Sequence, residues 1–159
     1  MHDRLFIPGP VEVRPELLQA ISKPQVGHRT QAYMDVHSAT IPLLKKILYT
    51  EQDVLLFTCS ATGVMEGSLR NLCQKKALVT VNGAFSKRWF QIAGFNGIPA
   101  DKLEVPMGQA VRPEAVDAAL ATGQYDQFCA VFNETSTGVR APLEKYSEVL
   151  KKHPDVMFC

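Results

Sequence analysis

The chain has 159 residues, 46% of them hydrophobic, so it can bury the core of one domain but hardly of two. Seventeen basic and sixteen acidic residues leave a formal charge of +1, which argues against a nucleic-acid surface and a polybasic membrane patch. No apolar run has the length of a membrane span, and residues 1–10 lack the apolar stretch of a signal peptide. We therefore expect a cytoplasmic protein that binds a small molecule.

The N-terminal segment is predicted to be an extended arm followed by a short helix. Residues 5–10 read LFIPGP, and a glycine between two prolines excludes a helix there and indicates a rigid bend. Pro15 is expected to open a helix that ends at Ile21. The loop after it carries His28 and Arg29, to which we assign no role.

A longer helix is predicted over residues 31–49, where apolar side chains recur at helical spacing. Pro42 interrupts this pattern. A proline inside a helix removes a backbone donor and clashes with the preceding turn. The pattern therefore indicates either a kink at Pro42 or a second helix capped by Thr40.

The stretch 58–71, TCSATGVMEGSLRN, joins a short apolar run to a helical pattern through a hydroxyl-rich turn. The run Val54–Phe57 predicts a strand buried on both faces. The first backbone N–H groups of the following helix are free, and with the hydroxyls of Ser60 and Thr62 they suit a phosphate. From this stretch alone, an ordinary N-cap at Ser60 or Thr62 is an equally good interpretation.

The rest of the chain alternates between predicted strands and helices, which favours a mainly parallel sheet with helices on both faces. Phe85 and Trp89 lie at helical spacing and are first interpreted as core residues. Strands are predicted at 77–81, 102–105, 128–132 and from 155 onward, and helices at 85–97, 113–120 and 142–152.

Polar loops follow three of the predicted strands, at 60–63 (SATG), 82–85 (NGAF) and 133–138 (NETSTG). Because ligands of open α/β sheets bind beyond the carboxyl ends of the strands, we expect these loops to converge. Their hydroxyls, N–H groups, acidic side chain and aromatic ring suit a planar phosphorylated ligand. A dinucleotide site or a serine-hydrolase elbow fits less well, since no strand is followed by G-x-G-x-x-G and Ser60 lacks the flanking glycines.

The four cysteines are widely spaced, without a C-x-x-C pair and without histidines at metal-ligand spacing. This spacing indicates neither a disulfide framework nor a metal site. We expect reduced core residues at Cys59, Cys73, Cys129 and Cys159.

Five short motifs occur in an order that resembles the class V aminotransferases, most closely the serine-pyruvate/alanine-glyoxylate branch. They are PGP at 8–10, GHR at 27–29, SATG at 60–63 with Glu66 and Asn71, NGAFSKR at 82–88 and ETSTGV at 134–139. The resemblance implies an α/β fold, the three-layer, mainly parallel sheet of the PLP-dependent transferase (aspartate aminotransferase-like, type I) major domain. It covers less than half of a typical member, so the domain is expected to be incomplete. Residues 1–30 would be an N-terminal arm and loop, and residues 31–159 the N-terminal part of the PLP-binding large domain.

The resemblance implies pyridoxal 5'-phosphate (PLP) as the cofactor. In the family pattern Ser60, Ala61 and Thr62 hold the phosphate, with Ala61 in place of the usual glycine. Phe85 corresponds to the aromatic residue that stacks on the pyridine ring, which revises its interpretation as a core residue. Thr135 corresponds to the hydroxyl near the ring oxygen or the substrate.

The resemblance also separates substrate contacts from catalytic groups. Gly9 would approach the substrate carboxylate through its backbone. No catalytic residue is assigned within the chain, because the Schiff-base lysine and the aspartate that partners the pyridinium nitrogen are expected beyond Cys159.

The implied activity is a transamination by a cytoplasmic homodimer, between alanine or serine and glyoxylate or pyruvate. The 159-residue chain alone is expected to be inactive. Two alternatives stay open: a PLP-dependent lyase or desulfurase on the same fold, and a non-catalytic α/β binding module. No nucleic-acid or membrane partner is expected.

Overall fold

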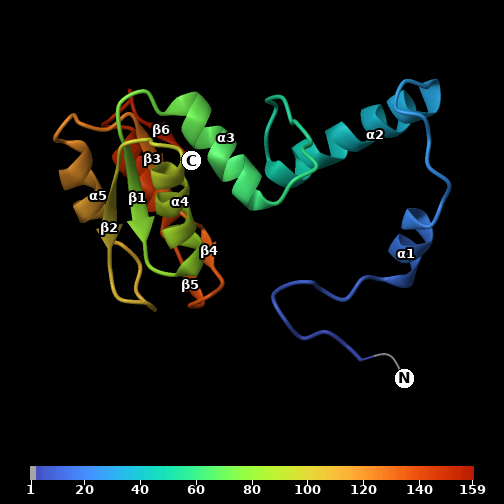
Figure 1. Cartoon of the computed structure of the whole chain (residues 1–159), viewed down its shortest axis with the longest axis horizontal. Helices are drawn as coiled ribbons and strands as arrows, with labels where there is room; N and C mark the ends of the chain where they lie inside the picture. The colour runs from blue at the N-terminus through green and yellow to red at the C-terminus, as the bar shows by residue number, and fades with distance from the viewer. Residues whose placement is uncertain (1–2) are drawn as a thin grey trace. The chain divides into compact units, whose positions relative to one another are not determined.

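The computed structural model describes residues 3–159, which form two compact units (Figure 1). The first unit ends at Phe57, and the second runs from Thr58 to Cys159. Each unit is described by itself. The expected division at residue 30 concerns the domains of a longer protein and stays a prediction.

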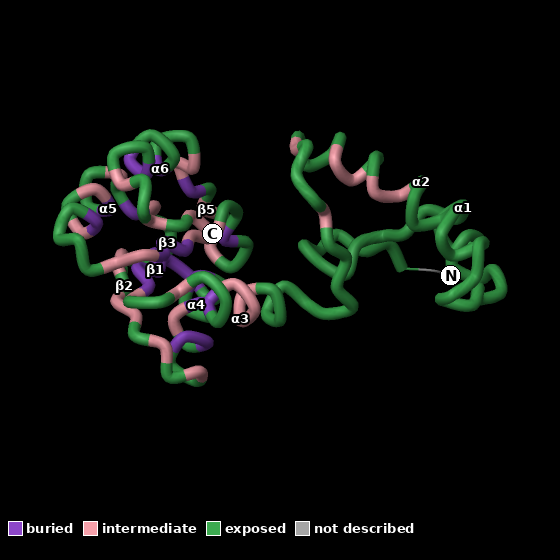
Figure 2. The backbone as a smooth tube through the Cα atoms, turned by 90° about the horizontal axis from the view of Figure 1, so that it is seen from above, coloured by how far each residue is buried: buried purple, intermediate pink, exposed green. Residues whose placement is uncertain are grey.

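The first unit contains two helices, α1 (Pro15–Ile21) and α2 (Gln31–Leu48), which confirms both predicted helices. Neither helix contains a buried residue, and every buried residue of the described chain lies in the second unit (Figure 2). Thr30 caps α2 by accepting a hydrogen bond from the N–H of Tyr33 at 3.5 Å. The apolar side chains of this unit therefore have no buried core within the described chain.

Pro42 lies inside α2, and the helix runs through it without a break in its assigned bounds. The alternative of a second helix capped by Thr40 is wrong. The Thr40 hydroxyl donates to the carbonyl of Val36 at 2.7 Å, the bond of a threonine within a helix rather than at its start.

The second unit is built on a four-stranded, wholly parallel sheet with the strand order β2-β1-β3-β6. Central β1 is buried along its whole length, and its sequence ALVTV is rich in β-branched residues that suit a covered strand. The strands are β1 (Ala77–Val81), β2 (Ala100–Glu104), β3 (Gln127–Cys129) and β6 (Met157–Phe158).

Helices cover both faces of this sheet. Alternate residues of β1 point to opposite faces, so their neighbours show which helices lie on each face. Leu78 belongs to a cluster with α5 (Pro113–Leu120) and α6 (Leu143–Leu150), whereas Val79 belongs to a cluster with α3 (Ala61–Leu72) and α4 (Ala84–Phe95). Burying each large apolar side chain contributes about 1.5–3 kcal/mol. The result is the predicted three-layer α/β arrangement, which is confirmed.

Two strand predictions differ most from the structure, while the strands predicted at 102–105 and from 155 onward are observed as β2 and β6 with shifted bounds. Residues Val54–Phe57 form no strand, and the side chain of Leu55 is 73% exposed. An apolar run becomes a strand only when a neighbouring strand pairs with it, and no described strand does so here. The strand predicted at 128–132 is shorter, since only β3 (Gln127–Cys129) joins the sheet.

One element was not anticipated from the sequence. Within the loop NETSTG and its neighbours, β4 (Asn133–Glu134) pairs with β5 (Val139–Arg140) in an antiparallel hairpin. Gly138 has a φ of 71°, a conformation that glycine adopts without a steric penalty. This hairpin brings its turn residues next to α4.

Candidate functional site

The turn between β1 and α4 is held from inside by a serine. The hydroxyl of Ser86, which is fully buried, accepts hydrogen bonds from the N–H of Asn82 at 2.9 Å and of Gly83 at 3.0 Å. These bonds satisfy two backbone donors ahead of the first turn of α4. The Asn-Gly turn therefore has a defined conformation before any ligand binds.

The β4–β5 hairpin is fastened to the same helical turn by Glu134. Its carboxylate is fully buried and accepts from the backbone N–H of Ser86 at 2.8 Å and of Phe85 at 3.3 Å. Ser136 adds two bonds, since its hydroxyl donates to Glu134 at 2.6 Å and accepts from the N–H of Ala84 at 2.9 Å. Two of the three predicted loops, 82–85 and 133–138, therefore meet as expected.

These bonds also affect the protonation of Glu134. Burial by itself raises the pKa of a carboxyl group. In Glu134 the hydrogen bonds from Ser136, from Ser86 and from Phe85 outweigh burial and hold the pKa below its usual value. The group at the N-terminus of α4 is therefore an ionised carboxylate at neutral pH, where the helix dipole also favours negative charge.

The two predicted ring and substrate contacts lie in these adjoining segments. Phe85 is 50% exposed at the start of α4, while Trp89, one helical turn later, is 7% exposed and packs in the core. Thr135 is exposed between Glu134 and Ser136. The core interpretation of Trp89 is confirmed, and Phe85 has the accessible surface that a ligand contact needs.

The predicted phosphate residues lie at the N-terminus of α3. Ser60 is the N-cap, with φ −75° and ψ 169°, and its side chain makes no capping hydrogen bond. The N–H of Gly63 bonds to the carbonyl of Ser60 at 3.0 Å, but no described residue accepts from the N–H of Ala61 or Thr62. Ser60 therefore takes the N-cap position, as one interpretation predicted, but without a capping hydrogen bond from its hydroxyl, and Thr62 lies inside α3.

The N-termini of α3 and α4, which cover the same face of the sheet, differ in whether their first backbone N–H groups have acceptors. In α4 the first three N–H groups, of Ala84, Phe85 and Ser86, are all bound by hairpin side chains. In α3 the N–H groups of Ala61 and Thr62 have no acceptor within the described chain. An external phosphate therefore has donors available at α3 and not at α4.

Ala61 in place of glycine is compatible with this turn. Tyr49 is the one non-glycine residue with positive φ in the described chain, so Ala61 does not adopt a conformation that needs glycine. The exposed hydroxyls of Ser60 and Thr62 flank it. The residues present thus fit a phosphate group at the start of α3.

The structure does not join all predicted contacts into one cluster. Helices α3 and α4 pack side by side through Leu69 and Ile92 (Figure 1), but no described hydrogen bond or ion pair links Ser60–Thr62 to Phe85 or Thr135. The apolar strand expected before Ser60 is absent. Joint binding of one ligand by these residues stays a prediction.

Gly9 belongs to the other unit, in the exposed arm before α1. The Gly9–Pro10 peptide bond is cis, and no heavy atom lies within 4 Å of the position that a side chain would take at Gly9. His28 and Arg29 are exposed in the turn before α2. The substrate role of Gly9 stays a prediction.

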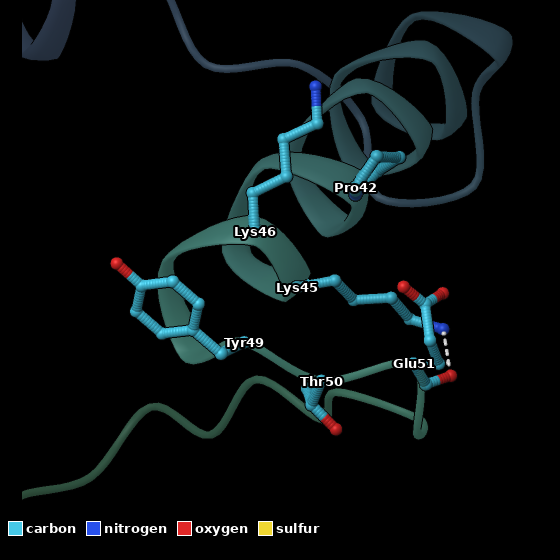
Figure 3. A pocket seen from close by; sticks show the side chains of 6 residues that line it. All are labelled: Pro42, Lys45, Lys46, Tyr49, Thr50 and Glu51. Carbon is cyan, nitrogen blue, oxygen red and sulfur yellow. Dashed lines mark hydrogen bonds between the residues drawn. The ribbon is translucent and has the colours of Figure 1, made fainter.

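The first unit also carries a hollow beside the end of α2, away from all predicted site residues in the sequence (Figure 3). Within it the ammonium group of Lys45 donates to the backbone carbonyl of Glu51 at 2.9 Å, while Lys46 points away from this pair. The lining residues are Pro42, Lys45, Lys46, Tyr49, Thr50 and Glu51.

The cysteines show mixed surroundings. All four are free thiols, and Cys129 is buried, as expected for a core residue. Cys59 is exposed, so the core prediction is wrong for it, because the apolar run that precedes it is not covered. Among the described residues, no three histidine, cysteine or acidic side chains are grouped closely enough to hold a metal ion, and no helix could cross a membrane.

No protein-family model matches the chain, but individual proteins do. An uncharacterized aminotransferase from Methanocaldococcus jannaschii is 40% identical over 154 residues, which cover 94% of this chain and 40% of that protein. An aspartate aminotransferase from Thermus thermophilus is 36% identical with a TM-score of 0.89, covering 98% of this chain and 44% of the other. An alanine–glyoxylate aminotransferase from Nostoc sp. is 28% identical with a TM-score of 0.88, covering 96% and 41%.

Over nearly its whole length the chain is similar to aminotransferases, and these include alanine–glyoxylate and serine–glyoxylate aminotransferases of class V. It spans about two fifths of the length of the curated relatives it matches, as the 40% coverage of the Methanocaldococcus protein shows. Its parallel sheet with helices on both faces is part of the aspartate aminotransferase-like fold. The free start of α3 and the α4–hairpin junction are the two candidate parts of a cofactor site in this chain.

Proposed function

We propose that the complete protein is a PLP-dependent transaminase that moves an amino group between alanine or serine and glyoxylate or pyruvate. The observation that carries the proposal is the start of α3, where two backbone N–H groups and two exposed hydroxyls have no acceptor in the described chain. The similarity to class V aminotransferases supports it, since the similar proteins include an alanine–glyoxylate aminotransferase.

Each candidate residue would have a distinct task with PLP. Ser60 and Thr62 would bind the phosphate through their hydroxyls, and Ala61 through its N–H group. Phe85 would present its ring to the pyridine, and Thr135 would offer a hydroxyl to the ring oxygen or the substrate. When bound, PLP supplies the electron sink that withdraws charge from the α-carbon of the amino acid.

The groups that handle the proton would lie outside this chain. Its lysines include Lys76, paired with Asp101, and Lys152, paired with Asp117, which is typical of surface residues. We infer that the lysine that bonds to PLP and the acidic group beside the ring nitrogen follow Cys159. A cytoplasmic homodimer is part of the same proposal.

A coupled assay tests whether the groups that handle the proton lie outside this chain. The purified chain should show no alanine-to-glyoxylate transfer above a PLP-only control, whereas the full-length protein should turn over. Turnover by the isolated chain would contradict the inference about the lysine. Release of sulfide or another elimination product without amino transfer would instead identify a lyase or desulfurase, and absence of PLP binding by the full-length protein would leave the binding module.

Substitution of Ser60 tests the proposed phosphate site. In the full-length protein Ser60→Ala should weaken PLP binding about 10-fold or more, because a hydrogen bond to a charged group contributes about 1.5–3 kcal/mol. Its cofactor-free stability should not change, since the Ser60 side chain makes no capping bond. Ser147→Ala, on the exposed face of α6, is the matched control and should leave PLP affinity unchanged. Equal affinity of wild type and Ser60→Ala would remove Ser60 from the site.

A further inference from the structure

The buried carboxylate of Glu134 has four hydrogen-bond donors and no cationic partner among the described residues. It accepts from Phe85 N–H, from Ser86 N–H, from the hydroxyl of Ser136 and, at 3.4 Å, from Ser136 N–H. No described lysine or arginine forms an ion pair with it. A carboxylate buried without a counter-ion must be stabilised by hydrogen bonds and by the N-terminal end of a helix. Both are present here.

These bonds are arranged around the two predicted cofactor contacts. Thr135 lies between Glu134 and Ser136, and both of these neighbours bond to the first turn of α4. Phe85 lies between Ala84 and Ser86, and the backbone N–H groups of both these residues donate those bonds. Thr135 is thus the middle residue of 134–136, and Phe85 is the middle residue of 84–86. The first and last residues of each segment are hydrogen-bonded to the other segment.

The close approach depends on the absence of a side chain at Gly83. A methyl group there would lie 2.6 Å from the Ser136 hydroxyl and closer still to the side chain of Glu134. The hairpin therefore sits directly against the backbone of the Asn-Gly turn. Small changes in the position of Glu134 would move Phe85 and Thr135 relative to one another.

We propose that Glu134 is a positioning residue for the cofactor: it holds Phe85 and Thr135 in fixed relation and occupies the N-terminus of α4 with an internal anion. The second effect leaves the free N–H groups of α3 as the place for the external phosphate. This inference rests on the proposed function, because it assumes that Phe85 and Thr135 face PLP.

A merely structural role would have different consequences. It would lower the stability of the folded protein, but the folded fraction would bind PLP with unchanged affinity. A positioning role makes the PLP affinity of the folded protein depend on Glu134 through Phe85. The effects of substitutions at the two residues should then be non-additive, as for residues that act together.

The test is a double-mutant cycle on the full-length protein, with PLP affinity measured by fluorescence titration and the bound cofactor observed by near-UV circular dichroism. Glu134→Gln and Phe85→Leu should each weaken PLP binding about 10-fold. The double variant should bind no more than about twofold more weakly than the weaker single variant. The dichroism of bound cofactor should also change in Glu134→Gln.

Two further variants keep the test decisive. Glu144→Gln removes an exposed carboxylate that pairs with Arg140 of the same hairpin, and it should leave PLP affinity unchanged. If Glu134→Gln does not fold, Ser136→Ala replaces it, since it removes a donor to Glu134 while the carboxylate keeps both backbone donors on α4. Ser136→Ala should weaken PLP binding a few-fold, again without additivity with Phe85→Leu.

The outcomes separate this inference from the proposed function. The positioning role would be overturned if Glu134→Gln bound PLP with wild-type affinity. It would also be overturned if the loss of PLP affinity in the double variant equalled the product of the two single losses. In both cases the wild-type protein would still bind PLP and transaminate. Failure of the wild-type protein to bind PLP would overturn both. Weakened, coupled binding with altered dichroism would support the positioning role.

Discussion

Gly83 lies where side chains of the β4–β5 hairpin pack directly against the turn before α4. Its φ is −179°, an extended conformation that any residue can adopt, so the need for glycine here is one of space. The side chains of Glu134 and Ser136 occupy the volume that a methyl group would take. In contrast, Gly94 in the same α4 helix has no heavy atom within 4 Å of that position.

These two glycines predict opposite effects of the same substitution. Gly83→Ala should lower the free energy of unfolding by about 1–3 kcal/mol, the usual cost of overpacking. Gly94→Ala should raise it by about 0.5–1 kcal/mol, because alanine in a helix loses less conformational entropy on folding. Urea unfolding of the purified chain, followed by the fluorescence of its one tryptophan, Trp89, measures both. A stability loss at Gly94 equal to that at Gly83 would contradict the steric argument.

Phe85 and Trp89 show how far residue type determines environment. Both are aromatic and both lie on α4, yet one is half exposed and the other is buried. The spacing of the aromatics predicted the helix but could not separate their roles, since burial depends on which neighbours cover each side chain. The family resemblance distinguished them, and the exposure of Phe85 is compatible with the role it implied.

At the scale of elements, α6 is joined to the loop before α5 by a buried tyrosine. The hydroxyl of Tyr146 donates to the carbonyl of Val111 at 2.6 Å, and its ring meets Phe128 of β3 edge-on with a centroid distance of 5.4 Å. Burial raises the pKa of Tyr146 to about 12, so the hydroxyl stays a donor at neutral pH. One side chain thus connects a helix, a strand and a loop.

Removing this hydroxyl should loosen the connection without creating a large cavity. Tyr146→Phe should lower the free energy of unfolding by about 1–3 kcal/mol, because the buried carbonyl of Val111 loses its donor. Tyr49→Phe, at a position that is 96% exposed, is the matched control and should change stability by no more than about 0.5 kcal/mol. Urea unfolding of both variants is the measurement. Equal stabilities would show that water replaces the lost donor.

At the scale of the whole second unit, two acidic side chains join segments that are distant in sequence. Glu134 joins the hairpin to α4, and Asp126 joins the start of β3 to the turn before β1. The carboxylate of Asp126 accepts from the N–H of Gln74 at 2.8 Å, of Lys75 at 2.7 Å and of Lys76 at 3.1 Å. Burial opposes ionisation of Asp126, but these backbone bonds lower its pKa below the usual value.

This arrangement predicts that acid destabilises the fold. Both folded-state pKa values lie below the ordinary values of 3.8 for Asp126 and 4.5 for Glu134, so the unfolded chain binds protons first as pH falls. Their contribution is complete above about pH 4.5 and is lost as pH falls through the lowered values. The urea midpoint of the purified chain should therefore decrease between pH 5 and about pH 2.

Substitution of Asp126 tests how much of this pH dependence comes from its carboxylate. Asp126→Asn should lower the free energy of unfolding at pH 7 by about 1–3 kcal/mol, since the charged acceptor of three backbone donors is lost. It should also reduce the decrease in stability with falling pH. Asp155→Asn, at an exposed position without a hydrogen bond among the described residues, should retain the wild-type profile. Identical profiles for Asp126→Asn and wild type would contradict the assignment.

Local sequence patterns are enough to predict several elements and the resemblance to class V aminotransferases. Helical spacing and prolines at N1 predicted α1 and α5 with their observed bounds, and the run ALVTV predicted β1. These elements follow from short-range preferences, namely the fixed φ of proline and the β-branched residues of a covered strand. The order of five short motifs was enough to indicate class V, which the comparisons confirm.

Which side chains meet, and which apolar runs are covered, depends on contacts between residues that are distant in the sequence. Residues Val54–Phe57 are as apolar as a buried strand, but strand formation requires a partner, and none of the described strands provides one. Glu134 and Ser86 are 48 positions apart, so no local pattern indicates that the carboxylate occupies the N-terminus of α4. That contact depends on a hairpin and on the space left by Gly83, and it is the reason why the first backbone N–H groups of α4, unlike those of α3, have acceptors within the described chain.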